Sequence, residues 1–491
     1  MIKNKIVLLY PKMGYDFLKF QAPPHGLLTI AASLEKAGFK IKIIDQRVEN
    51  DFKEKLLEEI KNCLFIGISS MTGKQLEFAI EISKIIKKNS PKIPLIWGGI
   101  HPTILPKETL KNEFIDFIII GEGEKAFVQL AKAIKQKNNY KHIKNLGFKK
   151  NKRIIINKKN KFINLNELPL TPWHLLNVEK YVFKYKKNEK NIRELDLGTT
   201  SRGCPAACHF CYNLAINKRQ WRSLSAKKVF YMIIKVVNDY KINKIIFRDD
   251  DFFADLKRVE EICKLIIKNN LDIEWYSAGI RIETFNIMKD FLIKLIKKSG
   301  CSSFRFGVES GSPRILKYIN KKIKPTEIIE ANKKCMQHKI IPHYSFMIGF
   351  PTEKIKDMMM TVDLINKLKK DNPSAVIHCV NILTPYPGTA LFNIMKKEGM
   401  NIPTKTNEWI KFHHLNLVTP KIRKKEQKMI KTINELSYMM SDIAYDNLPY
   451  VLKTISYPIK KWCGFRWKNK LFRFTPELLI LKKIREKTLG I

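Results

Sequence analysis

Apolar runs and helical patterns alternate five times between the start of the chain and about residue 138. Each run is apolar at nearly every position and is followed by a segment whose apolar residues recur at helical spacing. Runs of this kind suit parallel strands that are buried on both faces, and the helices between them suit the crossovers. The pattern therefore predicts a doubly wound α/β domain over residues 1–138. The expected strands are 6–10, 41–45, 63–69, 93–99 and 114–120.

Small and turn residues stand where these expected strands end. In doubly wound sheets, ligands bind outside the carboxyl ends of the strands, and glycine there lets a ligand approach the backbone closely. We expect a nucleotide-like or tetrapyrrole ligand at this edge, the alternative being an accessory domain with an empty crevice. His101 either faces such a ligand or caps the helix that follows it, and the cap is the simpler interpretation. The other candidate contacts are Pro24, Gly26, Ser69, Ser70, Gly98, Gly99, Gly121, Glu122 and Gly123.

A second alternation of strands and helices occupies residues 191–395, after a proline-punctuated linker expected over 139–190. Six strand signals amount to three quarters of a (β/α)8 barrel. They predict a partial (β/α)6 barrel whose functional residues stand at the carboxyl ends of the strands. Residues 396–491 are mostly helical and very basic. The expected barrel strands are 194–201, 244–250, 273–281, 302–310, 342–350 and 376–387.

Charge and hydropathy limit the classes of protein to which this chain can belong. Lys and Arg number 91 against 46 Asp and Glu, a formal net charge of +45, which would suit an anionic partner such as nucleic acid or a membrane surface. The lysines are spread along helix faces rather than gathered in one patch, so we attribute most of this charge to composition. No apolar run approaches the roughly 18 residues of a membrane-spanning helix, and the N-terminus has the pattern of a first strand rather than of a signal peptide. We therefore expect a cytoplasmic protein.

Cys204, Cys208 and Cys211 crowd within eight residues, directly after an expected strand. Nine cysteines at uneven positions do not suggest a disulfide framework, and such a group favours metal or redox chemistry. Three thiolates hold three irons of a [4Fe-4S] cluster and leave the fourth iron open for chemistry. A zinc site completed by His209 is the rival, but His209 is squeezed between two of the ligands in sequence. Five of the other six cysteines fall in expected strands and helices, where free cysteine packs as a small apolar residue.

The CxxxCxxC loop and the ends of the expected barrel strands resemble those of the radical S-adenosylmethionine (SAM) enzymes. The resemblance implies that SAM chelates the open iron and that one-electron reduction cleaves it to a 5′-deoxyadenosyl radical. It also implies an aromatic contact to adenine, polar contacts to the methionine and ribose groups, and a backbone contact to adenine. Barrel packing, or for residues 249–251 a solvated loop end, is the alternative. The implied SAM contacts are Phe210, Asp249, Asp250, Arg281, Glu309, Ile348 and Gly349.

The N-terminal domain is similar to the cobalamin-binding domain that precedes the barrel in cobalamin-dependent radical SAM enzymes. Residues 23–45, 97–103 and 118–124 carry the similarity. It implies that cobalamin is the ligand of the glycine-lined edge, with His101 among its contacts. The Asp-x-His-x-x-Gly motif that supplies an axial histidine in cobalamin mutases is absent, because Gly26 follows His25 directly and no aspartate stands two residues before it. The resemblance therefore implies cobalt without a histidine ligand from the protein.

The two resemblances imply a cobalamin-dependent radical SAM enzyme, and the expected reaction is methylation of an unactivated carbon. Ring closure or rearrangement on the same cofactors, methylthio transfer, and a non-catalytic cobalamin and cluster sensor are the alternatives. Methylthiotransferases hold a second cluster with N-terminal cysteines, whereas only Cys63 stands in that domain here, and the set of barrel-end residues argues against a sensor. The implied partners are a small-molecule or lipid-like substrate and a one-electron reductant such as flavodoxin or ferredoxin. No catalytic residue of the chain is identified.

Residues 460–474 interleave lysines and arginines with tryptophans and phenylalanines. We expect this segment to close over the barrel mouth, with basic side chains whose stems lie on apolar surface. A membrane surface is the second hypothesis, which would place the protein peripherally at the inner face of a membrane. Nucleic acid, whose bases stack on such aromatics, is the least favoured of the three.

Overall fold

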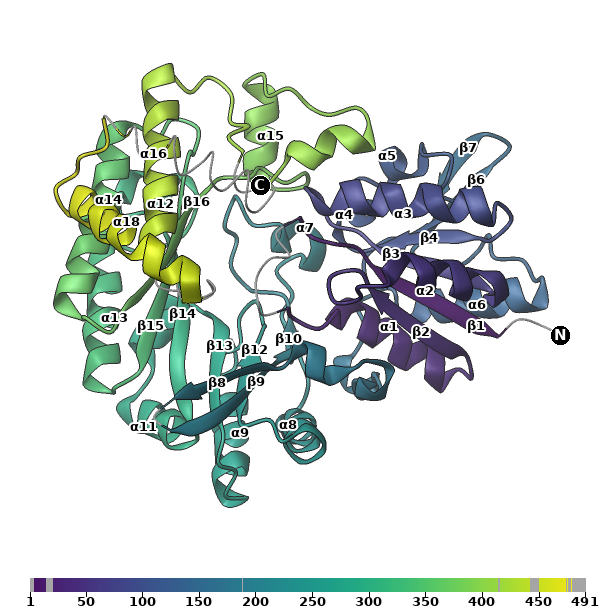
Figure 1. Cartoon of the computed structure of the whole chain (residues 1–491), viewed down its shortest axis with the longest axis horizontal. Helices are drawn as coiled ribbons and strands as arrows, with labels where there is room; N and C mark the ends of the chain where they lie inside the picture. The colour runs from purple at the N-terminus through teal and green to yellow at the C-terminus, as the bar shows by residue number, and fades with distance from the viewer. Residues whose placement is uncertain are drawn as a thin grey trace.

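The first sheet is built from the five apolar runs of the N-terminal part and a following hairpin (Figure 1). The computed structural model describes residues 4–14, 21–187, 189–413, 416–441, 450–473, 475 and 478. The strands run in the order β2-β1-β3-β4-β5-β6-β7, parallel up to β5 and antiparallel from β5 to β7, so the predicted doubly wound sheet is confirmed. Their bounds are Lys5–Tyr10, Lys40–Asp45, Phe65–Ser69, Leu95–Gly98, Phe117–Ile119, Leu146–Lys150 and Arg153–Ile156 for β1 to β7.

Helices cover both faces of this sheet. The elements are α1 (His25–Lys36), α2 (Phe52–Glu59), η1 (Ile60–Asn62), α3 (Gln75–Asn89), α4 (Ile100–Ile104), α5 (Pro106–Leu110) and α6 (Glu124–Gln136). Ile6 and Leu8 of β1 pack in one hydrophobic core with α1 and α6, while Val7 and Leu9 pack in a second core with α2 and α3. Burial on both faces explains why the run is apolar at successive positions.

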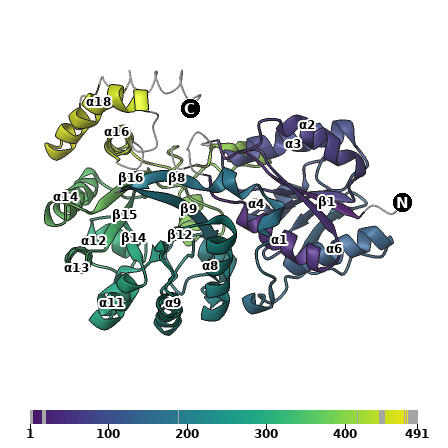
Figure 2. The same ribbon diagram turned by 60° about the horizontal axis from the view of Figure 1, so that its bottom comes forward.

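The second sheet curls into a partial barrel beside the first (Figures 1 and 2). Its order is β16-β15-β14-β13-β12-β9-β8, and all neighbours are parallel except the β8–β9 pair. Six parallel strands confirm the predicted (β/α)6 barrel. The bounds are Phe183–Lys187 for β8, Lys190–Gly198 for β9, Lys244–Phe247 for β12, Glu274–Ile280 for β13, Cys301–Glu309 for β14, Ile341–Ile348 for β15 and Val376–Ile382 for β16.

Helices lie on the outer side of the curled sheet, as Figure 2 shows for α8, α9, α11, α13 and α14. These are α8 (Ala226–Tyr240), α9 (Leu256–Lys268), α10 (Ile282–Ile287), α11 (Asp290–Lys298), α12 (Pro313–Tyr318), α13 (Pro325–Gln337) and α14 (Ile355–Asp371). Smaller elements join the two units and shape the strand ends. They are η2 (Leu165–Glu167), η3 (Trp173–Leu175), η4 (Val178–Tyr181), β10 (Ser201–Arg202), α7 (Asn213–Asn217) and β11 (Arg222–Ser223).

The C-terminal part begins with α15 (Ala390–Lys397) and η5 (Thr406–Lys411) and continues with α16 (Lys424–Met440) and α18 (Tyr450–Lys468). Helix α16 lies along β16. The Val380 backbone N–H donates to Ser437 Oγ at 2.9 Å, and Asn434 Nδ2 donates to the Val380 carbonyl at 2.7 Å. Helix α16 therefore occupies the open side of the barrel and bonds to the backbone of its last strand.

Helix α18 packs on α16 and carries most of the 460–474 segment. Cys463 and Trp467 are buried, and Lys470 Nζ lies 2.5 Å from the Asp363 carboxylate of α14. Trp462 and Phe465 are about half exposed, at 47% and 52%, and their rings stack at 5.6 Å. Phe474 lies outside the described residues. The segment thus has a buried face that reaches the barrel through α16 and an aromatic face turned to solvent. Over the ranges that the structure describes, no helix combines the length and apolar character of a membrane span.

Both hydrophobic cores include residues of the first sheet and of the part of the chain that follows it. Trp409 and Phe412, from η5 and the residue that follows it, are buried in the same core as Val7 and Leu9 of the first sheet. Asn112 Nδ2 donates to Thr406 Oγ1 at 2.7 Å across the same boundary. Segments far apart in sequence therefore hold the first sheet against the barrel.

Candidate active site

Cys204, Cys208 and Cys211 lie in the loop between β10 and α7, where the two units meet (Figure 1). All three are partly buried and none forms a disulfide. Burial raises the pKa of each thiol, and each of the other two thiols adds to the effect at Cys211. Bound irons would supply the positive charge that turns such thiols into thiolate ligands. This donor set on one loop fits a cubane cluster, which takes its thiolates on separate irons.

His209 is engaged away from the thiols. Its Nδ1 lies 2.9 Å from the Tyr318 carbonyl, and its backbone N–H donates to the Ile319 carbonyl at 2.9 Å. Its own carbonyl accepts from the Leu391 N–H at 2.9 Å. His209 therefore anchors the cysteine loop to α12 and α15. No three His, Cys, Asp or Glu side chains within the described ranges converge on a point suited to a single metal ion.

Three consecutive carboxylates after β12 hold the segment that leads into the cysteine loop. Asp249 Oδ1 accepts from the Thr200 N–H at 3.0 Å, from Thr200 Oγ1 at 2.9 Å and from Ser201 Oγ at 2.5 Å. Asp250 accepts from the Gly203 N–H at 3.1 Å, and Asp251 Oδ2 lies 3.8 Å from Cys204 Sγ. The three like charges stand together because each contacts a different part of residues 200–204.

Cationic and acidic side chains from the next strand ends flank the thiols. Arg281 follows β13, pairs with Glu283 at 2.6 Å and interacts electrostatically with Cys204. Glu309 ends β14 with a φ of +72°, and its carboxylate lies 3.3 Å from Lys321 Nζ. Burial opposes the charge on Lys321, but Glu309 and Cys208 raise its pKa. The third and fourth strand ends thus meet the cysteine loop, and the assignment of Arg281 and Glu309 to SAM stays a prediction.

Glu353 positions the end of the fifth strand, and sequence reasoning overlooked it. Its Oε2 accepts from the backbone N–H of Gly349 at 2.6 Å and of Phe350 at 3.1 Å. Gly349 has a φ of +88°, a conformation that favours glycine. Burial raises the pKa of Glu353 to about 8. The signal was local: an acidic residue four positions after Gly349, where a loop with unpaired N–H groups needs an acceptor. Phe210, from the cysteine loop, packs beside the core that contains Phe350.

The carboxyl ends of the first sheet form a second glycine-lined edge. The Ser70 N–H donates to the Gly98 carbonyl at 2.8 Å, and a Cβ on Gly99, whose φ is +100°, would lie 2.6 Å from the Ser70 carbonyl oxygen. At Gly26 and Gly121, no heavy atom of the described residues beyond the adjacent backbone lies within 4 Å of the position that a Cβ would take. These open glycines fit the close approach of a large planar ligand to the backbone.

The two histidines near this edge are engaged within the protein. His101 is fully buried, and its Nδ1 lies 3.0 Å from Thr72 Oγ1. Burial lowers the pKa of His101 to about 3, so its ring is neutral, and its side chain forms no helix-capping hydrogen bond. His25 begins α1, and its Nε2 lies 3.0 Å from Asp196 Oδ1 in β9. Although burial raises the pKa of Asp196, His25 and Arg248 lower it to about 2. His25 therefore links the first unit to the barrel.

The Glu122 side chain also connects the two units. Its Oε1 lies 2.9 Å from Arg202 and 2.7 Å from Arg222, and its Oε2 accepts from the Ile163 N–H at 2.9 Å. Arg202 pairs in addition with Glu124 at 2.7 Å. Arg202 stands two residues before Cys204, so the glycine-lined loop of the first sheet and the cysteine loop are joined by ion pairs.

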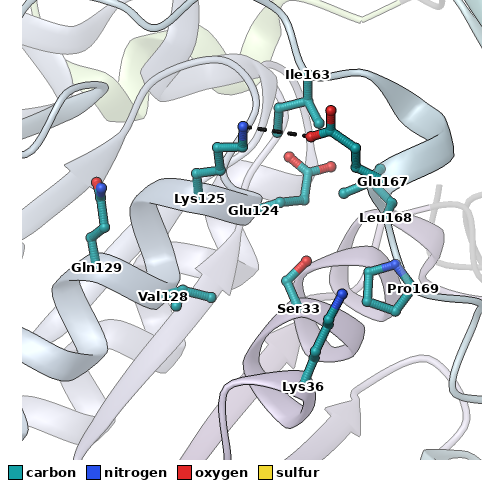
Figure 3. A pocket seen from close by; sticks show the side chains of 10 residues that line it. All are labelled: Ser33, Lys36, Glu124, Lys125, Val128, Gln129, Ile163, Glu167, Leu168 and Pro169. Carbon is teal, nitrogen blue, oxygen red and sulfur yellow. Dashed lines mark ion pairs between the residues drawn. The ribbon is translucent and has the colours of Figure 1, made fainter.

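A surface pocket of about 290 Å³ lies on the outer side of α1 and α6, where the linker crosses them (Figure 3). Lys125 of α6 points toward Glu167 of the linker, with their charged groups 3.8 Å apart. Neither the cysteines nor the open glycines line it. The residues that line this pocket are Ser33, Lys36, Glu124, Lys125, Val128, Gln129, Ile163, Glu167, Leu168 and Pro169.

Comparison with known proteins identifies both halves of the chain. Residues 17–131 match the B12 binding domain, and residues 199–365 match the Radical SAM superfamily. An uncharacterized methyltransferase of Pyrococcus horikoshii is 32% identical over 374 residues, which is 75% of this chain and 78% of that protein. The anaerobic magnesium-protoporphyrin IX monomethyl ester cyclase of Synechocystis is 23% identical over 416 residues, 84% of this chain and 80% of the cyclase.

The fold has a solved counterpart over the whole chain. The cobalamin-dependent S-adenosylmethionine radical enzyme OxsB, solved with aqua-cobalamin and S-adenosylmethionine bound, superposes with a TM-score of 0.73. The two share 17% sequence identity, and the match covers 100% of this chain and 76% of OxsB. The order of the units, a B12-type sheet followed by a partial barrel, is thus the same in both molecules.

Proposed function

Because the chain belongs to the cobalamin-dependent radical SAM enzymes, we propose that it transfers a methyl group from SAM to an unactivated carbon of a small molecule. Its cofactors are a [4Fe-4S] cluster, SAM and cobalamin. When bound, the cluster supplies the electron that cleaves SAM, and cobalamin supplies the carrier of the methyl group. The chain itself holds and orients these groups and keeps water away from them. The relative from Pyrococcus, which is named a methyltransferase, supports this reaction.

One observation carries the proposal: the strand ends of the two units are joined beside the cysteine loop. Arg202 bridges Glu122, from the loop after β5, and Glu124, the first residue of α6, to the segment that leads into Cys204. The glycine-lined edge and the thiols therefore belong to one interface rather than to separate sites. A reaction that moves a group between two cofactors needs their binding loops adjacent and fixed, because orientation supplies much of the rate.

We assign roles to the site residues on this basis. Cys204, Cys208 and Cys211 hold the cluster. The contacts assigned to SAM are those of Phe210, Arg281, Glu309, Ile348 and Gly349. Cobalamin approaches the backbone at the open glycines and the loops around Ser69, Ser70, Gly98, Gly99 and Pro24. The side chains of Asp249, Asp250, Glu122 and His101 act indirectly, because each is committed to a contact within the protein.

Isotope tracing tests the proposed reaction. Cells with and without the gene, and cells carrying only the Cys208→Ala variant, would be fed methionine labelled in its methyl group. We expect a metabolite or lipid that carries the label only when the intact gene is present, together with its unmethylated precursor in the other two strains. An unlabelled product that depends on the gene would contradict methyl transfer. Such a product would favour ring closure, the reaction named for the Synechocystis relative.

Cobalamin is expected to bind with no protein nitrogen on its cobalt. His101 is fully buried, with its Nδ1 3.0 Å from Thr72 Oγ1, so burial shields its ring from a ligand at the glycine-lined edge. The Nε2 of His25 is paired with Asp196. The measurement is the electron paramagnetic resonance spectrum of the cob(II)alamin form, which should lack splitting from a coordinated protein nitrogen. Splitting that disappears in a His25→Gln or His101→Gln variant would contradict this expectation.

Enzymes of this superfamily act on small-molecule substrates and draw electrons from an external reductant. Flavodoxin or ferredoxin is the reductant that we propose here. A peripheral membrane contact would use the exposed Trp462 and Phe465 with the neighbouring lysines, since their faces are turned away from α16. The buried face of the same helix packs on α16, and closure of the barrel mouth by residues 460–474 stays a hypothesis.

A further inference from the structure

The inner face of the partial barrel carries a layer of basic and aromatic side chains. Residues alternate along β14 and β15, so that Phe304, Phe306 and Tyr344 are buried toward the helices while Arg305 and His343 face the inside of the curl. Arg305 and His343 are register partners on adjacent strands. Tyr276 of β13 and His378 of β16 complete the layer. Charged and polar groups in this position are unusual for a barrel interior, which is ordinarily filled with branched apolar side chains.

Within this layer the uncharged groups contact one another. His343 Nδ1 lies 3.3 Å from His378 Nε2. The rings of Tyr276 and His343 are nearly parallel, at 8°, with centroids 6.4 Å apart. The other cations of the inner face are neutralised: Lys244 lies 3.2 Å from both Glu194 and Glu274, and Arg248 pairs with Asp196. These neighbours of Arg305 therefore have contacts of their own within the layer or with carboxylates.

Arg305 is the exception, because its guanidinium forms no ion pair or hydrogen bond with any described residue. It is only partly exposed. Burial and repulsion from Arg248 lower the pKa of Arg305, and burial together with Arg305 lowers the pKa of His343 to about 4. Burial and Arg305 also lower the pKa of His378. Both imidazoles are thus neutral at physiological pH. Among the described residues, Glu309 attracts the Arg305 guanidinium electrostatically, but no carboxylate forms an ion pair with it.

The path from Arg305 to the candidate SAM site is lined by small residues. Glu309 stands four residues further along β14, roughly 13 Å at about 3.3 Å per residue. Gly307 lies between them, and a Cβ there would come within 2.6 Å of Glu309 Oε1 and 3.2 Å of Lys321 Nζ. Ala278 and Ser345 stand on the neighbouring strands, Ser345 as the register partner of Gly307. A ligand held at Arg305 would therefore extend toward the cysteine loop without meeting a large side chain on β14.

We propose that Arg305 binds a carboxylate of the substrate, with Tyr276, His343 and His378 as its polar surroundings. A guanidinium presents parallel N–H donors that match a carboxylate in a bidentate pair, and the neutral imidazoles add donors or acceptors without adding charge. A single guanidinium balances a monoanion, whereas a phosphate dianion would leave excess negative charge. This assignment rests on the proposed function, because it takes the inner face of the barrel as the place of the substrate. The assignment predicts that the substrate is a small molecule with a carboxylate group.

Equilibrium binding of three probes tests the assignment: hexanoate, hexanol and hexyl phosphate. The protein would be loaded with cluster and cobalamin and kept without reductant, so that binding is measured in the absence of any reaction. We expect hexanoate to bind more tightly than both other probes. Arg305→Gln should weaken hexanoate binding about ten- to a hundredfold, the loss that removal of a charge-assisted pair brings, and leave hexanol unchanged. Arg153→Gln, at an exposed position of β7, is the matched control and should change nothing.

A second variant, Arg305→Lys, separates loss of the guanidinium from misfolding of Arg305→Gln. Lysine keeps the charge but loses the bidentate geometry, so hexanoate affinity should fall by a smaller factor than in Arg305→Gln. Equal affinity for hexanoate and hexanol, or hexanoate affinity that is unchanged in both variants, would overturn the proposal. Tighter binding of hexyl phosphate would overturn the choice of carboxylate. If the probes bind as expected but isotope tracing finds no labelled product, methyl transfer is contradicted and the carboxylate site is not.

Discussion

Cys208→Ala is expected to abolish the iron-sulfur cluster and, with it, all reductive cleavage of SAM. Two remaining thiolates leave two irons of a cubane without protein ligands, and the loop offers no replacement because His209 is bound to the Tyr318 carbonyl. Anaerobically purified wild-type protein should hold about four irons and four sulfides per chain. The variant should hold almost none and should form no 5′-deoxyadenosine after reduction.

The matched control is Cys335→Ala, which removes a buried thiol from α13. It should retain the iron content of the wild type, because this cysteine packs in the core. Thermal unfolding of both variants separates loss of the cluster from loss of the fold. A Cys208→Ala protein that keeps its full iron content would place the cluster elsewhere in the chain.

Glu309→Ala is expected to weaken SAM binding about ten- to a hundredfold while the iron content stays the same. Removal of one charge-assisted hydrogen bond costs roughly 1.5–3 kcal/mol, which gives this range. The structure adds a second effect, since Lys321 would lose the carboxylate 3.3 Å from its ammonium group and remain beside Cys208. Backbone strain at residue 309 does not affect the comparison of Glu309→Ala with the wild type. The φ of +72° is equally unfavourable for glutamate and alanine, so its cost cancels.

Titration of SAM into the protein, followed by calorimetry, measures this change. Glu309→Gln keeps the shape and one acceptor, and its affinity should fall between those of the wild type and Glu309→Ala. Glu330→Ala, at an exposed position of α13, serves as the control for loss of one negative charge. Unchanged affinity accompanied by a lower unfolding temperature would mean that Glu309 contributes to packing and not to SAM binding.

Local patterns predicted the strands and the cysteine loop because their causes are local. A run buried on both faces must be apolar throughout, and three ligands in one loop show themselves by spacing. The roles of Asp249 and Glu122 follow from partners about fifty to a hundred residues away, which no local pattern reveals. His25 is the clearest case, since Asp196 stands 171 residues further along the chain.

Two residues have a local signal in the sequence that lies outside the predicted motifs. Glu353 stands four positions after Gly349, close enough to accept hydrogen bonds from the turn that this glycine makes. Arg305 stands in the middle of a run that the sequence predicts to be a barrel strand, and alternation from Phe304 and Phe306 gives it an inward position. A charge at such a position requires an explanation on sequence grounds alone, because barrel interiors are apolar. What sequence does not reveal is that no carboxylate in the described part of the chain pairs with Arg305.

A barrel of six strands ends in a strand with no neighbour, and α16 covers that strand here. The unpaired N–H and C=O groups of an exposed strand edge are a template on which a second chain adds its own strand. Asn434 and Ser437 occupy both backbone groups of Val380 and so block that template at its centre. A chain cut short before α16 would keep its cysteines and most of its core but would expose the edge. Its copies would then aggregate edge to edge, so the C-terminal helices govern solubility as well as shape.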